Sequence, residues 1–273
     1  KTIKMGEFFR SFQMPDEYFS WFHCGSLIRK EIIKQTLNRI GYKNRIFSLA
    51  EETGFCRLSN MNSVLFVDIG LNQKMVHNKK ASLFGFEFFY KKEKIISNLG
   101  EINNSKYKNM KNSLSSTAAH SSLNIDDRNN IDLSGRRITR ISNIQFGKTK
   151  DGNLLDVTHS GYETIFGVHH KRQIYLSNKK NEIRGRDEIL NIGNIGSIPK
   201  NAYIRFHLYP GIELIKTRSG SILLNHQKGY VWKMSSNNKN ISIENSVMFT
   251  PHGPKPCKAV SYTHLRAHET RPY

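Results

Sequence analysis

The stretch "AYIRFHLYP", residues 202–210, alternates apolar and polar side chains along its whole length. Successive side chains of an extended strand point to opposite faces of a sheet. The pattern therefore predicts a strand with two different faces. The apolar face holds Ile204, Phe206 and Leu208. The other face holds Arg205, His207 and Tyr209. One face can be buried while the other meets solvent or a ligand.

Strand-like segments of this kind recur before and after residues 202–210. They follow each other at spacings of roughly eight to twelve residues, with turn residues between them, which is typical of an all-β sandwich or barrel. The other segments are 62–70, 154–162, 171–177, 181–189, 212–217, 221–226, 230–236 and 241–249. Residues 81–100 hold two further segments around the polar "KKEK", which predicts a hairpin. The expected fold class is all-β and antiparallel.

One segment has helical spacing instead. In residues 28–40, apolar side chains recur on one helical face, and Gly41 follows as a stop signal. Those side chains are Ile28, Ile32, Ile33, Leu37 and Ile40. The polar stretch 102–115 and the Gly-containing stretch 191–200 are expected to be loops. The short "YETIF", residues 162–166, is expected to be extended.

The composition limits the classes of partner. The chain has 42 basic and 22 acidic residues, a formal net charge of +20. A basic surface favours nucleic acid, acidic polysaccharide or anionic lipid, although a Lys-, Asn- and Ile-rich composition also arises from AT-rich coding. No apolar run approaches the roughly 18 residues of a membrane-spanning helix. The cysteines Cys24, Cys56 and Cys257 form no C-x-x-C motif, which argues against a zinc ribbon and leaves one disulfide open.

The C-terminal stretch "VSYTHLRAHETRPY", residues 260–273, has a different character. It reads as the translation of a transposase-type sequencing adapter, in register from Val260 to Glu269 and into the codon of Thr270. We expect it not to be native sequence and exclude it from fold prediction. We also expect the authentic chain to extend beyond both ends of this sequence.

Four ordered stretches carry a resemblance to a known family. They are "SSTAAHSSLNIDD", "VTHSGYETIFGVHHKRQIYLS", "AYIRFHLYPGIEL" and "SIENSVMF". In this order they resemble the C-terminal domain of heparinase II/III-like proteins, a polysaccharide lyase-like family with an α/α toroid followed by an antiparallel β-sandwich. The resemblance implies a connecting segment with one helix over 1–45 and the sandwich over 46–258.

The resemblance also implies a chemistry. The family's reaction is β-elimination, in which a base removes the proton beside a uronate carboxylate and an acid protonates the leaving oxygen. The toroid supplies an Asn or His and a Tyr, which would lie upstream of this sequence. The 273 residues alone are therefore expected to be inactive.

His120 aligns with a histidine that ligates a structural zinc in several family members. The resemblance places Asn78 and Lys80 where two further histidine ligands would be, and Asn98 near an expected Asp. His77 is nearby but out of register. Because a protonated lysine cannot bind zinc, we expect no cofactor and a dismantled zinc site, with His120 as its remaining ligand. The alternatives for His120 are a buried structural histidine and a direct substrate contact.

The second stretch offers several candidate substrate-binding groups. His159 and Tyr162 match the family's H-D-G-Y pattern, with Ser160 in place of the Asp, and His170 and Arg172 match its G-x-x-H-x-R pattern. A guanidinium can bind a uronate carboxylate or a sulfate through two parallel hydrogen bonds.

The alternative for these groups is structural. Tyr162 would then cap a turn, and Arg172 would pair with an acid such as Glu182 or Asp187. Arg205 and His207 carry the same two interpretations.

Three function classes remain at this point. The first is the sandwich of a lyase acting on acidic, uronate-containing glycans in the bacterial cell envelope or periplasm. The second is a non-catalytic carbohydrate-binding or envelope-associated module. The third, a nucleic-acid-binding domain, has little support, because "FEFFYKK" only faintly interleaves aromatic and basic residues. The adjacent Asp126 and Asp127 are too common a pattern to indicate a glycosidase.

Overall fold

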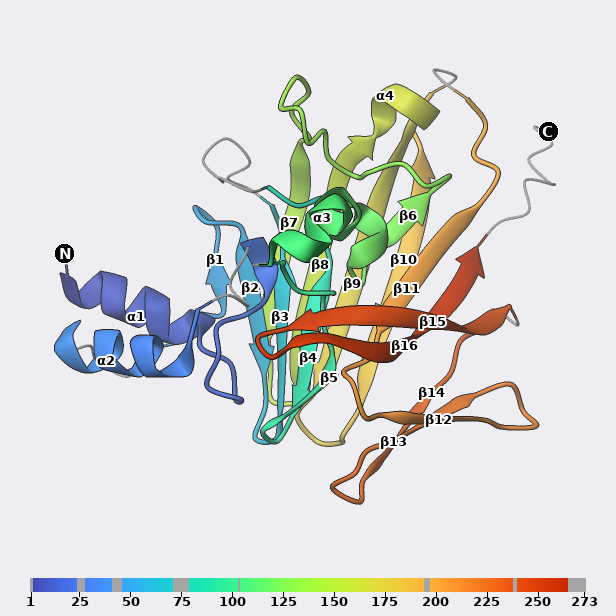
Figure 1. Cartoon of the computed structure of the whole chain (residues 1–273). Helices are drawn as coiled ribbons and strands as arrows, with labels where there is room; N and C mark the ends of the chain where they lie inside the picture. The colour runs from blue at the N-terminus through green and yellow to red at the C-terminus, as the bar shows by residue number, and fades with distance from the viewer. Residues whose placement is uncertain are drawn as a thin grey trace.

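The computed structural model describes residues 2–23, 28–40, 46–70, 79–102, 104–193, 197–237 and 240–264. Antiparallel sheets dominate it, as expected (Figure 1). The first sheet has the order β1-β2-β3-β4-β5 and consists of β1 (Leu49–Ala50), β2 (Phe55–Ser59), β3 (Ser63–Asp68), β4 (Phe86–Tyr90) and β5 (Glu93–Ile96). The second has the order β10-β9-β8-β7 and consists of β7 (Ile141–Lys148), β8 (Gly152–Tyr162), β9 (Val168–Ser177) and β10 (Ile183–Asn191).

The first two sheets share one hydrophobic core. Leu58 and Leu65 of the first sheet belong to the same buried cluster as Leu155 and Ile174 of the second. Side-chain amides also join the sheets, since Asn60 Nδ2 donates to the Ser177 carbonyl at 2.6 Å. The sandwich expected from the alternating strands is confirmed.

Two smaller sheets complete the described part of the fold. One has the order β15-β16-β11-β6 and consists of β6 (Leu123–Ile125), β11 (Ala202–His207), β15 (Ile241–Thr250) and β16 (Gly253–His264). The other has the order β12-β13-β14 and consists of β12 (Glu213–Lys216), β13 (Ile222–Asn225) and β14 (Val231–Met234). In β11, Ile204 is buried in a core cluster, and His207 is buried on the opposite face against the carbonyl of Ala118.

The N-terminal region holds two helices rather than one. α2 (Lys30–Ile40) is the helix predicted from the apolar spacing, with Ile33 and Leu37 buried. α1 (Thr2–Phe12) packs beside α2 and was not predicted (Figure 1). Its Phe12 lies against Phe55 and Phe66 of the first sheet, at ring-centroid distances of 4.8 and 5.0 Å. Among the described residues, no helix is long and apolar enough to cross a membrane.

Two local expectations were wrong. Residues 163–166 form the short helix α4 (Glu163–Phe166), because Gly167 adopts a left-handed conformation, with φ of 66°, and closes the turn. The expected loop 102–115 contains the 3-10 helix η2 (Ser105–Met110) and the helix α3 (Lys111–Ser115).

The C-terminal stretch excluded from prediction enters the fold in part. Residues 260–264 form the end of β16, where Val260 and Tyr262 are buried. The origin of residues 260–273 stays a prediction.

Candidate functional site

His120 is buried at the end of a short 3-10 helix. It follows η3 (Thr117–Ala119) as its C-terminal cap, and its side chain is 1% exposed. Its Nδ1 lies 2.9 Å from Oδ1 of Asn98, the residue that follows β5 by two positions. Its Nε2 has no hydrogen-bond partner within the described part of the chain. Since Nδ1 donates to the amide oxygen, the neutral ring keeps the lone pair on Nε2.

The surroundings of His120 favour its neutral form. Burial lowers the pKa of His120 well below its usual range, and the positive charge of Lys80 lowers it further, with smaller contributions from His23 and His207. The ring is therefore uncharged at neutral pH. A neutral imidazole with a free lone pair is a base or a ligand rather than a cation.

Lys80 lies in the same buried region. Its Nζ donates to the Gly100 carbonyl at 2.7 Å and lies 3.1 Å from Oε2 of Glu101. Lys80 is 1% exposed, which is unusual for a lysine. A buried ammonium of this kind requires a paired carboxylate, and Glu101 provides it.

The donor set at this position does not fit zinc. Structural zinc takes about four deprotonated nitrogen, sulfur or oxygen ligands. Lys80 offers an ammonium and Asn98 a neutral amide, so His120 is the one good ligand of the three. Among the described residues, no group of three or more His, Cys, Asp or Glu side chains could hold a metal ion. Asn78 and His77 lie outside the described residues.

A second buried cluster links three strands through histidines. Gly161 N donates to His159 Nδ1 at 3.0 Å, so the proton of the neutral ring lies on Nε2. His159 Nε2 in turn donates to His170 Nδ1 at 3.1 Å, and His170 Nε2 donates to Asp187 at 2.7 Å. Burial lowers the pKa of both histidines. The tautomers of both rings follow from this chain of donors.

The Arg172 side chain binds the same carboxylate, that of Asp187. Its Nε and Nη2 donate to Asp187 at 2.6 and 3.1 Å, and its Nη1 donates to the Phe84 and Ser121 carbonyls, both at 2.6 Å. Burial alone would raise the pKa of Asp187, but Arg172 and His170 hold it below its usual range. This is the structural alternative named for Arg172, with Asp187 as its partner.

Tyr162 and the residues of β11 are likewise engaged internally. The Tyr162 hydroxyl donates to the Leu123 carbonyl at 2.8 Å and is fully buried. Arg205 Nε donates to Glu244 at 3.2 Å, and His207 Nε2 donates to the Ala118 carbonyl at 2.8 Å. Of the seven candidate binding residues, Arg205 alone is not buried. Direct glycan contact by the other six stays a prediction, and all six have partners within the domain.

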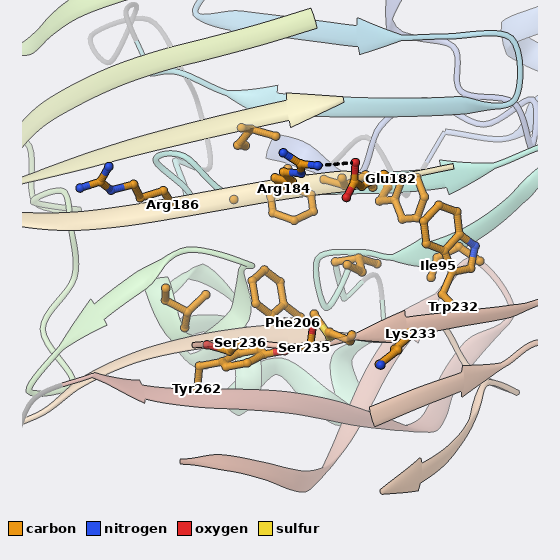
Figure 2. A pocket seen from close by; sticks show the side chains of 18 of the residues that line it. Ile95, Glu182, Arg184, Arg186, Phe206, Trp232, Lys233, Ser235, Ser236 and Tyr262 are labelled. Carbon is orange, nitrogen blue, oxygen red and sulfur yellow. Dashed lines mark hydrogen bonds and ion pairs between the residues drawn. The ribbon is translucent and has the colours of Figure 1, made fainter. Parts of the chain in front are cut away.

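An open cavity lies beside the second cluster. It has a volume of about 600 Å³ and is lined from β10 by Arg184, Arg186 and Asp187, together with Arg172 of β9. Figure 2 shows Arg184 and Arg186 on one side of the cavity and Phe206, Trp232 and Lys233 on the other. Arg184 pairs with Glu182 at 3.0 Å. The cavity thus combines aromatic and apolar walls with exposed cationic groups.

Sequence reasoning missed the cavity and the partner of Lys80. Arg184 and Arg186 are two positions apart in β10, so they share a face, and this period-2 signal could have been found. Lys233 and Trp232 come from β14, which is distant in sequence. Nothing in the sequence joins β10 to β14.

The described residues define an antiparallel β-sandwich domain with buried neutral histidines and a lysine–glutamate pair. Over residues 43–270 the chain matches the family model described as "Heparinase II/III-like, C-terminal". The chain belongs to this family. The resemblance drawn from the four sequence stretches is thereby confirmed.

Solved structures agree on the fold. The heparan sulfate lyase HepC from Pedobacter heparinus is 17% identical, with a TM-score of 0.68. The match covers 94% of this chain and 42% of that protein. A heparinase III gene product is 15% identical, with a TM-score of 0.73, and the coverages are 97% and 44%. Another heparinase III is 12% identical, with a TM-score of 0.71, and the coverages are 96% and 45%. This chain spans less than half the length of these proteins. No curated protein matched the chain.

Proposed function

We propose that this chain is the sandwich part of a polysaccharide lyase that cleaves acidic, uronate-containing glycans by β-elimination. Its membership of the heparinase II/III-like family carries the proposal. The net charge of +20 supports an anionic substrate. By the same resemblance, the protein acts in the bacterial cell envelope or periplasm.

In this proposal the sandwich supports the reaction rather than completing it. His120 is neutral and keeps a lone pair on Nε2, so it suits hydrogen bonding within the sandwich better than charge neutralisation. The buried Arg172–Asp187 pair holds β9 and β10 in register beside it. The groups that abstract and donate protons at the sugar would lie in the part of the protein outside this sequence.

The experiment is an assay of the complete gene product on heparan sulfate and other uronate glycans, followed by the ultraviolet absorbance of the new double bond. A neutral glycan is the control. We expect the complete protein to give absorbance with a uronate glycan and the 273-residue chain to give none. Absence of absorbance for the complete protein with every uronate glycan would overturn the lyase proposal.

The cavity favours a second candidate, a non-catalytic module that binds acidic carbohydrate. Sugar rings pack on aromatic side chains, and carboxylates or sulfates pair with guanidinium and ammonium groups. The cavity supplies these groups through Trp232, Lys233 and Arg186, which all line it. Calorimetric titration of the chain with an acidic and a neutral oligosaccharide tests this candidate. Equal affinity for both, or none for either, would remove it.

A further inference from the structure

Lys80 is anchored by two different kinds of oxygen. The Gly100 carbonyl accepts at 2.7 Å, and the Glu101 carboxylate lies 3.1 Å away, with the two charged side chains 1% and 4% exposed. A buried ion pair is retained when further hydrogen bonds satisfy its charges. The site is thus built for an ammonium ion.

The backbone at Gly100 is part of this arrangement. Its φ is +82°, a conformation that other residues rarely adopt, and a Cβ there would lie 2.0 Å from the Phe249 carbonyl oxygen. Glycine is therefore required at position 100. The carbonyl that receives Lys80 is fixed by a residue that has no substitute.

Lys80 also joins two separate segments around His120. It precedes β4, whereas Gly100 and Glu101 follow β5. Asn98, three residues before Glu101, accepts from His120. The ion pair thus fixes the segment that holds Asn98 against the segment that leads into β4.

We propose that the Lys80 ammonium is the built-in cation of this site and replaces the divalent metal ion that some family members hold there. A fixed positive charge repels a second cation, and a protonated amine has no lone pair for a metal. The same ammonium performs the structural task of a metal by joining the segments before β4 and after β5. This inference holds whether or not the complete protein is a lyase.

The first test is a double-mutant cycle on the purified chain, with thermal unfolding as the readout. Lys80→Met and Glu101→Gln each remove one charge of the buried pair and leave the opposite charge in place, so each is expected to lower the Tm by about 10 °C. The double variant removes both charges and is expected to recover several of these degrees. The matched control is Lys179→Met, which breaks an exposed pair with Asp151 and should shift the Tm by about 2 °C or less. Additive effects of the two substitutions would overturn the pairing.

The second test asks whether a metal site can be restored. Lys80→His combined with Asn98→Asp gives three zinc ligands together with His120. The folded variant, checked by circular dichroism, is expected to bind about one zinc per chain and to gain Tm with zinc, whereas the original chain responds neither to zinc nor to a chelator. A folded variant without zinc would overturn the placement of Lys80 at the metal position. An original chain that carries one zinc and loses Tm with the chelator would overturn the replacement itself.

Discussion

The Arg172 guanidinium and the Asp187 carboxylate meet across β9 and β10 through two hydrogen bonds of 2.6 and 3.1 Å. The two residues are direct neighbours in the strand register. The same carboxylate also accepts from His170, so one acid receives three donors from two side chains. This arrangement makes Asp187 the centre of the second buried cluster.

Substitution of Arg172 by methionine should be strongly destabilising. The change leaves Asp187 with the His170 donor but without its ion pair, and it removes the Nη1 donor of the Phe84 and Ser121 carbonyls. The free energy of unfolding is therefore expected to fall by about 3–5 kcal/mol. Denaturant unfolding measures this. Arg184→Met is the matched control, because Arg184 pairs with Glu182 at the exposed edge of β10 and its loss should leave the free energy of unfolding almost unchanged. Similar losses for both variants would contradict the buried role of Arg172.

Removal of one hydroxyl tests the position of Tyr162. Tyr162→Phe deletes the donor to the Leu123 carbonyl but keeps the buried ring. The free energy of unfolding should fall by about 1 kcal/mol, and the circular dichroism spectrum should stay the same. The matched control is Tyr175→Phe, whose hydroxyl donates to Asp151 in an exposed position. A larger loss for Tyr175→Phe would show that Tyr162 is less important to the fold than its contacts indicate.

The buried histidines make stability dependent on pH. Burial lowers the pKa of His207 to about 4, and burial also lowers those of His120, His159 and His170. A histidine in the unfolded chain has a pKa of about 6.5, so below that pH the unfolded chain binds more protons than the folded one. The stabilisation is therefore present above about 6.5 and is lost as pH falls.

For His207 alone, the free energy of unfolding should fall by about 2 kcal/mol between pH 7 and pH 5. His207→Gln should remove this part of the decrease. Denaturant unfolding at both pH values provides the measurement. An equal decrease in the variant and in the original chain would show that His207 is not neutral when folded.

Charge in the cavity is tested separately from stability. Lys233→Ala and Arg186→Ala should each weaken the binding of an acidic oligosaccharide about threefold to tenfold and reduce its salt dependence. Lys228→Ala, in the turn before β14, is the matched control and should leave the affinity unchanged. Calorimetric titration measures all three. If the control weakens binding as much as the cavity variants do, the attraction is a property of the net charge.

The sequence predicted many of the strands, because an alternating segment carries its own period-2 signal, but β2 and β7 were not among the predicted segments. The hairpin around Lys91 and Lys92 and the strand at residues 202–207 both follow from such local patterns. α4 escaped prediction because its four residues are too few to show a helical period, and Gly167 decides the turn. Local pattern therefore indicated many of the elements but not all of them.

The site was less accessible from sequence. Motif spacing led to His159, His170 and Arg172, and the structure joins them to Asp187, which was named beforehand only as one of two possible partners. The Lys80–Glu101 pair spans two strands and a hairpin, so it depends on tertiary packing. Sequence alone also could not distinguish a buried arginine with internal partners from one that faces a glycan, because an arginine in either role can occupy the same position of the strand.

A lyase and a hydrolase are distinguished by the masses of the products that the complete protein forms from a heparan sulfate oligosaccharide of defined length. Elimination adds no atoms, so we expect two fragments whose masses sum to the mass of the substrate, one of them carrying an unsaturated uronate. Fragments whose masses together exceed that of the substrate by one water would contradict the lyase proposal and indicate a hydrolase.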